Sequence, residues 1–280
     1  MKTEEINVIS KTGRPDACED LVYIGQYYAA VIDGTTSKTN RTWNGRTGGQ
    51  IAGTLVKGAL GKLHPEATFK EAAEALTSAI HELYISFDCL ETVRHEPMER
   101  ATATAAIYSG FRREIWLIGD CQALVDGQLI RPQHYVDEVS SAARAMYLSS
   151  ELMRGVDISV LRETDPGLAY ISGLLKRQTD FQNNYAAGQY FYTAVDGFPI
   201  PANGIVVWGL PTHVNSVVLA TDGYPALRES LAESEAALAD ILTFDPLMIG
   251  VYRSTKGLRP GDISFDDRAY LRISISDTSL

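Results

Sequence analysis

The chain has 280 residues, of which 45% are hydrophobic and 21% are charged, close to an average globular protein. This composition excludes a disordered or a fibrous protein. The formal net charge is −10, which argues against nucleic-acid binding through a basic surface. Such a charge is typical of a solvated acidic surface, and it is equally compatible with carboxylates that are gathered to hold cations.

The N-terminal residues contain no apolar segment of the kind that secretory signals need, and no apolar run is long enough to span a bilayer. The three cysteines, Cys18, Cys89 and Cys121, are widely spaced and form no CxxC pair. We therefore expect a reduced, cytoplasmic protein with no disulfide framework, no zinc site and no membrane partner.

Hydrophobic periodicity predicts strands and helices in the first half of the chain. Short apolar runs bounded by turn residues predict strands, and apolar residues at helical spacing predict two helices that pack as a hairpin. The predicted elements are strands 5–9, 21–24 and 27–32, helices 48–63 and 69–87, and strands 103–108, 114–118 and 123–125.

The second half is less regular, and its tyrosine-rich stretch 184–192 is interpreted as a buried strand, with a wall for a substrate as the alternative. Strands interleaved with helix pairs, without regular βαβ alternation, predict an α+β layered sandwich. The other predicted elements here are helices 135–152, 168–177 and 226–242 and strands 205–208, 216–220 and 267–275.

Acidic residues stand at the ends of five predicted strands. One aspartate at a strand end is usually a turn former, but carboxylates from several strands can converge at one edge of a sheet. There they repel one another unless a cation neutralises them, and an all-oxygen site suits Mg²⁺ or Mn²⁺. The five clusters are Glu19-Asp20, Asp33-Gly34, Gly119-Asp120, Asp222-Gly223 and Asp266-Asp267.

The order of these clusters resembles the metal-dependent protein serine/threonine phosphatase family, the protein phosphatase 2C type. Residues 101–105 match its Thr-rich strand, 119–123 match its Gly-Asp-Ser-Arg-Ala segment, and 267–270 take the place of Asp-Asn-x-Thr. The resemblance implies one domain over residues 1–280, with a variable, flap-like insertion around 134–200. The implied fold is a four-layer αββα sandwich of two antiparallel sheets flanked by helix pairs.

The resemblance also implies a centre of two Mg²⁺ or Mn²⁺ ions, with a third ion held more weakly. Two such cations would lower the pKa of a bridging water, which would attack phosphorus in line. The implied ligands are Asp33 bridging both metals, Asp222 and Asp267 on one metal, Glu19 and the Gly34 carbonyl on the other, Asp20 through water, and Asp120 on the third ion.

The sequence departs from the family at two catalytic positions. The family often has a histidine after Asp-Gly that helps to protonate the leaving group, but Thr35 stands here, and a threonine hydroxyl is a poor general acid. The phosphate-binding arginine is matched by Arg14, which precedes Glu19 by five positions rather than four, with Arg41 and Arg46 as alternates. Water or another histidine would then act as the acid, and the histidines are His64, His81, His95, His134 and His213.

The leading hypothesis is a metal-dependent phosphomonoester hydrolase that acts on phosphoserine or phosphothreonine in a protein. A second hypothesis is a pseudophosphatase or phospho-ligand sensor on the same fold, which the missing histidine and the shifted arginine motivate. A third keeps the chemistry but replaces the protein substrate with a small phosphorylated molecule.

Overall fold

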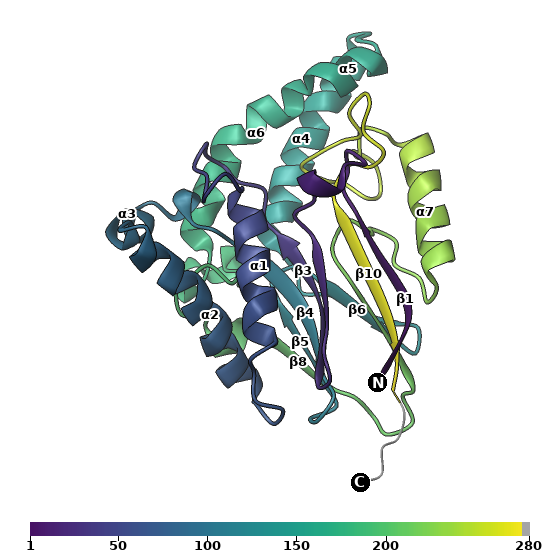
Figure 1. The fold of residues 1–280 in the computed structure, drawn as a ribbon. Coiled ribbons are helices and arrows are strands. Elements are labelled where there is room, and N and C mark those ends of the chain that lie inside the picture. The colour runs from purple at the N-terminus through teal and green to yellow at the C-terminus, as the bar shows by residue number, and fades with distance from the viewer. Residues whose placement is uncertain (276–280) are drawn as a thin grey trace.

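Two five-stranded antiparallel sheets form the centre of the molecule (Figure 1). The computed structural model describes residues 1–275. The first sheet has the strand order β2-β3-β4-β5-β8, and the second has the order β1-β10-β9-β6-β7. The α+β class and the two antiparallel sheets expected from the sequence are therefore confirmed.

Eight of the ten strands coincide with predicted ones to within a few residues at each end. The exceptions are β7, which completes the hairpin after the Asp126-Gly127 turn, and β1, which starts at Lys2 rather than at residue 5. The strands are β1 (Lys2–Ile9), β2 (Leu21–Ile24), β3 (Tyr28–Gly34), β4 (Ala103–Ser109), β5 (Glu114–Ile118), β6 (Gln122–Val125), β7 (Gln128–Ile130), β8 (Val206–Gly209), β9 (Ser216–Ala220) and β10 (Arg268–Ser274).

Strand β3 is buried on both of its faces, which explains its continuous apolar run. Ala29 and Val31 belong to the core between the two sheets, whereas Ala30 and Ile32 pack beneath helices. Because side chains alternate along a strand, Asp33 lies on the inter-sheet side. The last acidic residue of this strand is thus held at the edge of the space between the sheets.

Helices α1 (Gly48–Leu60) and α2 (Phe69–Ser86) cover the outer face of the first sheet (Figure 1). Both begin with a capping box, in which Thr47 and Thr68 accept hydrogen bonds from the backbone three residues later. Val56 of α1 and Leu76 of α2 pack with Ile32 in one buried cluster. The predicted helix hairpin is therefore present and is packed against the sheet.

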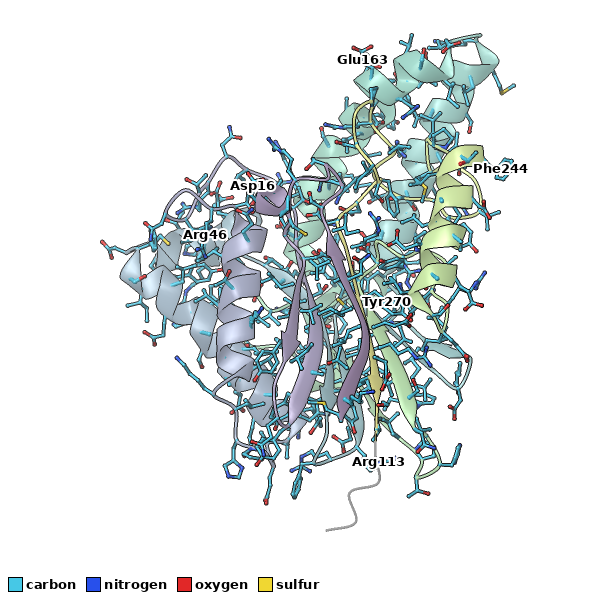
Figure 2. All side chains as sticks on the ribbon, turned by 45° about the vertical axis from the view of Figure 1, so that its right-hand side comes forward. Asp16, Arg46, Arg113, Glu163, Phe244 and Tyr270 are labelled. Carbon is cyan, nitrogen blue, oxygen red and sulfur yellow. The ribbon has the colours of Figure 1, made fainter. Side chains whose placement is uncertain are left out.

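Helix α7 (Leu231–Phe244) lies on the opposite side, against the second sheet. It starts at Leu231 rather than at residue 226. The Ser230 side chain caps its first turn, and residues 226–229 before it are not helical. Figure 2 shows Tyr270 beneath this helix and Phe244 pointing away from the molecule at its end. Tyr270 is fully buried, while Phe244 is 86% exposed.

Helices α4 (Tyr135–Met153), α5 (Ile158–Thr164) and α6 (Pro166–Arg177) project beyond the ends of the sheets (Figure 1). The sequence did not predict α5, nor the short helix α3 (Leu90–His95) that follows α2. Both are too short to show a clear apolar period. In the described residues, none of the helices combines the length and the hydropathy that a membrane span requires.

The tyrosine-rich stretch is not a buried strand, so that prediction was wrong. It contains 3₁₀ turns over Tyr185–Tyr190, and Tyr185 is 65% exposed. Asn184 caps the first turn, and Gly188 has a φ of 60°, a conformation that a regular strand does not use. Local turn chemistry has outweighed the high strand propensity of tyrosine here.

Candidate metal centre

A cavity of about 610 Å³ opens where the ends of both sheets meet helices α4 and α6. Six carboxylates line it, and four of them lie at strand ends, whereas Asp137 and Glu138 belong to α4. Asp33 is the penultimate residue of β3, Asp120 follows β5, Asp222 follows β9 and Asp266 precedes β10. Acids that are far apart in the sequence are therefore brought to one edge of the sandwich.

Burial and mutual repulsion both act on these carboxylates. Burial raises the pKa of Asp33 well above its usual range, and the charges of Asp20, Asp222 and Asp120 raise it further. Burial likewise raises the pKa of Asp222 to about 7, with Asp120 and Asp266 adding to the effect. The ionised forms of these acids are therefore disfavoured unless a positive charge compensates them, which is the condition that favours binding of a cation.

Of the two adjacent acids before β10, only Asp266 faces the cavity. Asp267 is buried, and its two carboxylate oxygens accept hydrogen bonds from the backbone N–H groups of Lys11 and Glu19, both at 2.8 Å. The Ser10 hydroxyl donates to the same carboxylate at 3.3 Å. The structure therefore turns Asp267, the residue that the resemblance made a ligand, toward the backbone and brings Asp266 to the cavity.

Glu19 and Asp20 lie behind the cavity wall and are both buried. The Thr47 hydroxyl donates to Glu19, and the Thr221 hydroxyl donates to Asp20 at 2.7 Å. Burial also raises the pKa of Asp20 well above its usual range, and the charges of Asp266, Asp267 and Asp222 raise it further. Both acids stand close to the cluster without reaching into the open space.

Two glycines let the chain close tightly around Glu19. A Cβ atom added to Gly34 would lie 2.6 Å from the carbonyl carbon of Gly49, and one added to Gly49 would lie 2.8 Å from Glu19 Oε1. Gly34 ends β3, and Gly49 lies in the first turn of α1. Helix α1 can therefore approach the strand end only because neither residue has a side chain.

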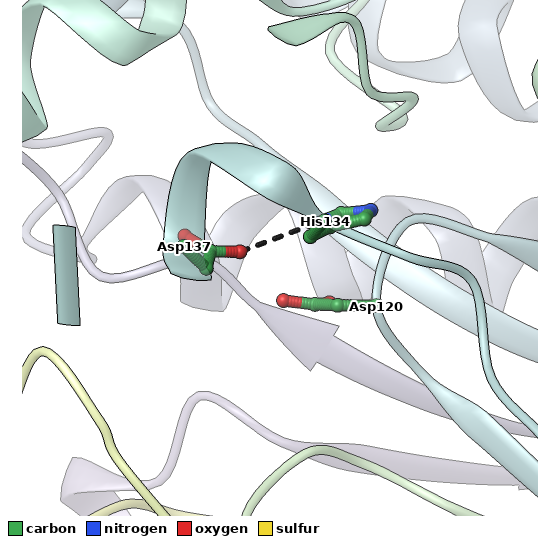
Figure 3. A group of neighbouring side chains, drawn as sticks. All are labelled: Asp120, His134 and Asp137. Atoms are coloured by element: carbon green, nitrogen blue, oxygen red, sulfur yellow. Dashed lines mark hydrogen bonds and ion pairs between the residues drawn. The ribbon is translucent and has the colours of Figure 1, made fainter. Parts of the chain in front are cut away.

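Asp120, His134 and Asp137 form a mixed group of oxygen and nitrogen donors at the start of α4 (Figure 3). Their ligand atoms all lie within 4.8 Å of one another. Within residues 1–275, no other group of three His, Cys, Asp or Glu residues has its ligand atoms this close together. His134 Nδ1 contacts Asp137 Oδ2 at 3.2 Å, and the Thr104 hydroxyl donates to Asp120 at 2.8 Å. This donor set could hold a further cation beside the main cluster.

His134 is the histidine that sequence reasoning could not single out from five. All five lie in the described part of the chain, and only His134 lines the cavity. Burial alone would lower its pKa, but the hydrogen bond to Asp137 and the charge of Asp120 raise it above its ordinary value. Its only sequence signal was its place next to the predicted helix 135–152.

Lys256, which sequence reasoning missed, reaches into the acidic cluster. Its ammonium donates to both carboxylate oxygens of Asp266, at 2.8 and 2.6 Å, and to the Thr36 hydroxyl at 3.3 Å. Burial alone would raise the pKa of Asp266, but the Lys256 charge outweighs it and the pKa is lowered. The residue lies in an irregular segment, so no pattern in the sequence could have marked it.

The predicted phosphate-binding arginines lie away from the cavity. Arg14 is exposed beside a 3₁₀ turn, and it does not line the cavity wall. Arg41 pairs with Glu99 at 2.7 Å, and Arg46 is exposed next to α1. The cationic side chains that do line the cavity are Lys38, Arg100, Arg131, Arg253 and Lys256.

The sequence matches no protein-family model and no curated protein. Among solved structures, the serine/threonine phosphatase PstP/Ppp of Mycobacterium tuberculosis is 17% identical, with a TM-score of 0.47, over 99% of this chain and 100% of that one. The serine/threonine phosphatase Stp1 of Staphylococcus aureus is 13% identical, with a TM-score of 0.45, over 99% and 96%. RsbX in complex with magnesium is 11% identical, with a TM-score of 0.46, over 98% and 99%. These similarities concern the fold.

Proposed function

We propose that this protein is a metal-dependent phosphomonoester hydrolase that acts on phosphoserine or phosphothreonine in proteins. The observation that carries the proposal is the convergence of four carboxylates, from four separate strand ends, on one cavity: Asp33, Asp120, Asp222 and Asp266. Carboxylates that share one part-buried cavity and raise one another's pKa are kept ionised when a cation offsets their charge.

The donor atoms fit Mg²⁺ or Mn²⁺, because the main cluster is made of oxygens. We propose two ions there and a third, weaker ion near His134. When bound, such ions lower the pKa of water and offset the charge of phosphoryl oxygens. Asp266 takes the place that the sequence resemblance gave to Asp267. The residues of the cavity wall that would hold the ions are Asp33, Asp120, Asp222 and Asp266. Glu19, Asp20 and the Gly34 carbonyl, which the resemblance also makes ligands, lie behind this wall and would support them.

Threonine hydroxyls orient three of these acids from behind. Thr47 donates to Glu19, Thr104 donates to Asp120, and Thr221 donates to Asp20. A carboxylate held in this way loses little conformational freedom when it binds a cation. Preorganised acids favour a catalytic centre over an ordinary acidic surface.

A phosphorylated side chain of a protein is the substrate that we favour. The cavity is part-open, and the exposed Arg131 and Arg253 stand on its wall, where they can attract a phosphorylated polypeptide. A small phosphorylated molecule is the alternative substrate, and a comparison of kcat/KM for the two classes distinguishes them.

The ion pair between Lys256 and Asp266 supports a second candidate function, that of a phospho-ligand sensor without turnover. An ammonium that already neutralises one carboxylate leaves less charge for a divalent cation to offset. A sensor would bind phosphopeptides tightly in calorimetry but would release no phosphate.

Hydrolysis of p-nitrophenyl phosphate with Mn²⁺ tests the hydrolase proposal. We expect Asp222→Asn and Asp33→Asn to lower the rate at least about a hundredfold, because each removes an acid from the cluster. Asp240→Asn is the matched control, since Asp240 is exposed on α7. Equal rates for the wild type and Asp222→Asn would rule out this site.

A further inference from the structure

Among the five cationic side chains on the cavity wall, Lys38 is the half-buried one without a partner. Lys256 is bound by Asp266, and Arg100 pairs with Asp196 at 2.9 Å. Across residues 1–275, no ion pair or side-chain hydrogen bond involves Lys38. An unpaired charge in a part-buried position costs free energy unless a ligand compensates for it.

The loop that carries Lys38 directly follows the Asp33-Gly34 strand end and is held by two hydrogen bonds just before Lys38. The Thr35 N–H donates to the Thr102 carbonyl at 3.0 Å. The Ser37 hydroxyl accepts from the Gly48 N–H at 2.9 Å. These contacts fix the backbone immediately before Lys38, and Lys38 itself lines the cavity.

The electrostatic surroundings of Lys38 favour an incoming anion. Burial lowers its pKa and the nearby Lys256 ammonium lowers it further, and together they outweigh the opposite effects of Asp137, Asp266 and Glu19. Burial and the Lys256 charge therefore penalise the charged form of Lys38. A phosphate dianion would offset both, because it supplies negative charge to two neighbouring ammonium groups.

We propose that Lys38 binds the phosphate group of the substrate, a role that the sequence resemblance gave to Arg14. The inference rests on the proposed function, since the phosphate must enter the cavity that the carboxylates line. Arg14 is exposed and away from the wall, whereas Lys38 is part of it. Lysine binds phosphate as a point charge and needs no bidentate geometry.

Calorimetric titration of the Mn²⁺-loaded protein with inorganic phosphate tests this role. We expect Lys38→Met to weaken phosphate binding at least about tenfold, and Lys38→Arg to restore most of the affinity because it keeps the charge. The KM for p-nitrophenyl phosphate should rise in parallel in Lys38→Met. The affinity for Mn²⁺ should not fall, since a positive charge has been removed from the cavity.

Arg14→Met and Arg131→Met are the comparison variants, because Arg14 is the cation that the resemblance selected and Arg131 is an exposed cation of the cavity wall. Wild-type phosphate affinity in Lys38→Met would overturn the proposal, as would a larger loss in either arginine variant. If the wild type binds phosphate through Lys38 but shows no turnover, the hydrolase proposal fails while the role of Lys38 stands. A wild type that binds no phosphate overturns both.

Discussion

Lys256 and Asp266 form a bidentate ion pair inside the acidic cavity, with Nζ 2.8 and 2.6 Å from the two carboxylate oxygens. Asp222 and Asp33 also contribute to raising the pKa of Lys256, against the lowering effect of burial. The ammonium thus stands where a divalent cation would be attracted. Binding of such a cation must overcome the repulsion of this lysine or displace it.

We therefore expect Lys256→Met to increase the affinity for Mn²⁺ by roughly tenfold. Two unit charges about 4 Å apart repel each other by ~1 kcal/mol in water and ~4 kcal/mol near a protein surface, and a divalent ion about doubles the repulsion. Isothermal titration with Mn²⁺ measures the effect, and Lys57→Met, on the exposed face of α1, is the control. A weaker Mn²⁺ affinity in Lys256→Met would contradict the idea that the lysine competes with the cation.

Two glycines of helix α1 should respond in opposite directions to alanine. In Gly49→Ala the new Cβ lies 2.6 Å from the Gly34 carbonyl carbon, so we expect a loss of roughly 1–3 kcal/mol in the free energy of unfolding. In Gly58→Ala the Cβ meets nothing within 4 Å, and helix propensity should add about 0.5–1 kcal/mol. Urea denaturation measures both. Equal effects in the two variants would mean that the close approach at Gly49 does not matter.

The buried ion pair between Arg144 and Asp165 should be important for stability. Arg144 is fully buried, its Nη2 lies 2.9 Å from Asp165, and it also donates to the carbonyls of Leu247 and Ser254. It thereby ties α4 to the start of α6 and to the segment that precedes Lys256. We expect Arg144→Met to lower the free energy of unfolding by roughly 3–5 kcal/mol, because it leaves a buried carboxylate unpaired.

Arg154→Met is the matched control for this pair. Arg154 follows the end of the same helix, and its contact with Glu151 is long and exposed. Such a surface pair contributes about 0–1 kcal/mol. Thermal denaturation of both variants should separate them clearly, and similar melting temperatures would argue against a structural role for Arg144.

The lowered pKa of Glu235 predicts that the stability of the protein depends on pH. Burial acts to raise its pKa, but hydrogen bonds from Arg268 at 2.8 and 2.9 Å and from Tyr224 lower it below its ordinary value of 4.5. A lowered folded-state pKa stabilises the fold above the unfolded value, and this contribution disappears as the pH falls through the folded value.

We expect Glu235→Gln to lower the free energy of unfolding at pH 7 by about 1 kcal/mol, a value reduced for its partial exposure. The difference from the wild type should shrink as the pH falls below 4.5 and should vanish in stronger acid. Urea denaturation across this range measures it, with exposed Glu74→Gln as the control. A difference that is constant with pH would show that the carboxylate charge plays no part.

The limits of prediction from the sequence are clearest at Asp266 and Asp267. The resemblance selected Asp267, but adjacent side chains at a strand end point in opposite directions, and no local pattern says which one faces the site. The choice depends on the backbone N–H groups of Lys11 and Glu19, which are far away in the sequence. These donors satisfy Asp267 and leave Asp266 for the cavity.

Most of the strands, the main helices and the acids at strand ends were predictable, because they depend on periodicity and turn chemistry within a few neighbouring residues. Asp33, Asp120 and Asp222 belong to this group. The cationic half of the cavity was not predictable. Lys38 and Lys256 lie in irregular segments without a pattern, and they face the acids only because the packing of two sheets and the projecting helices brings distant loops together. Side-chain direction and electrostatic partners are properties of that packing.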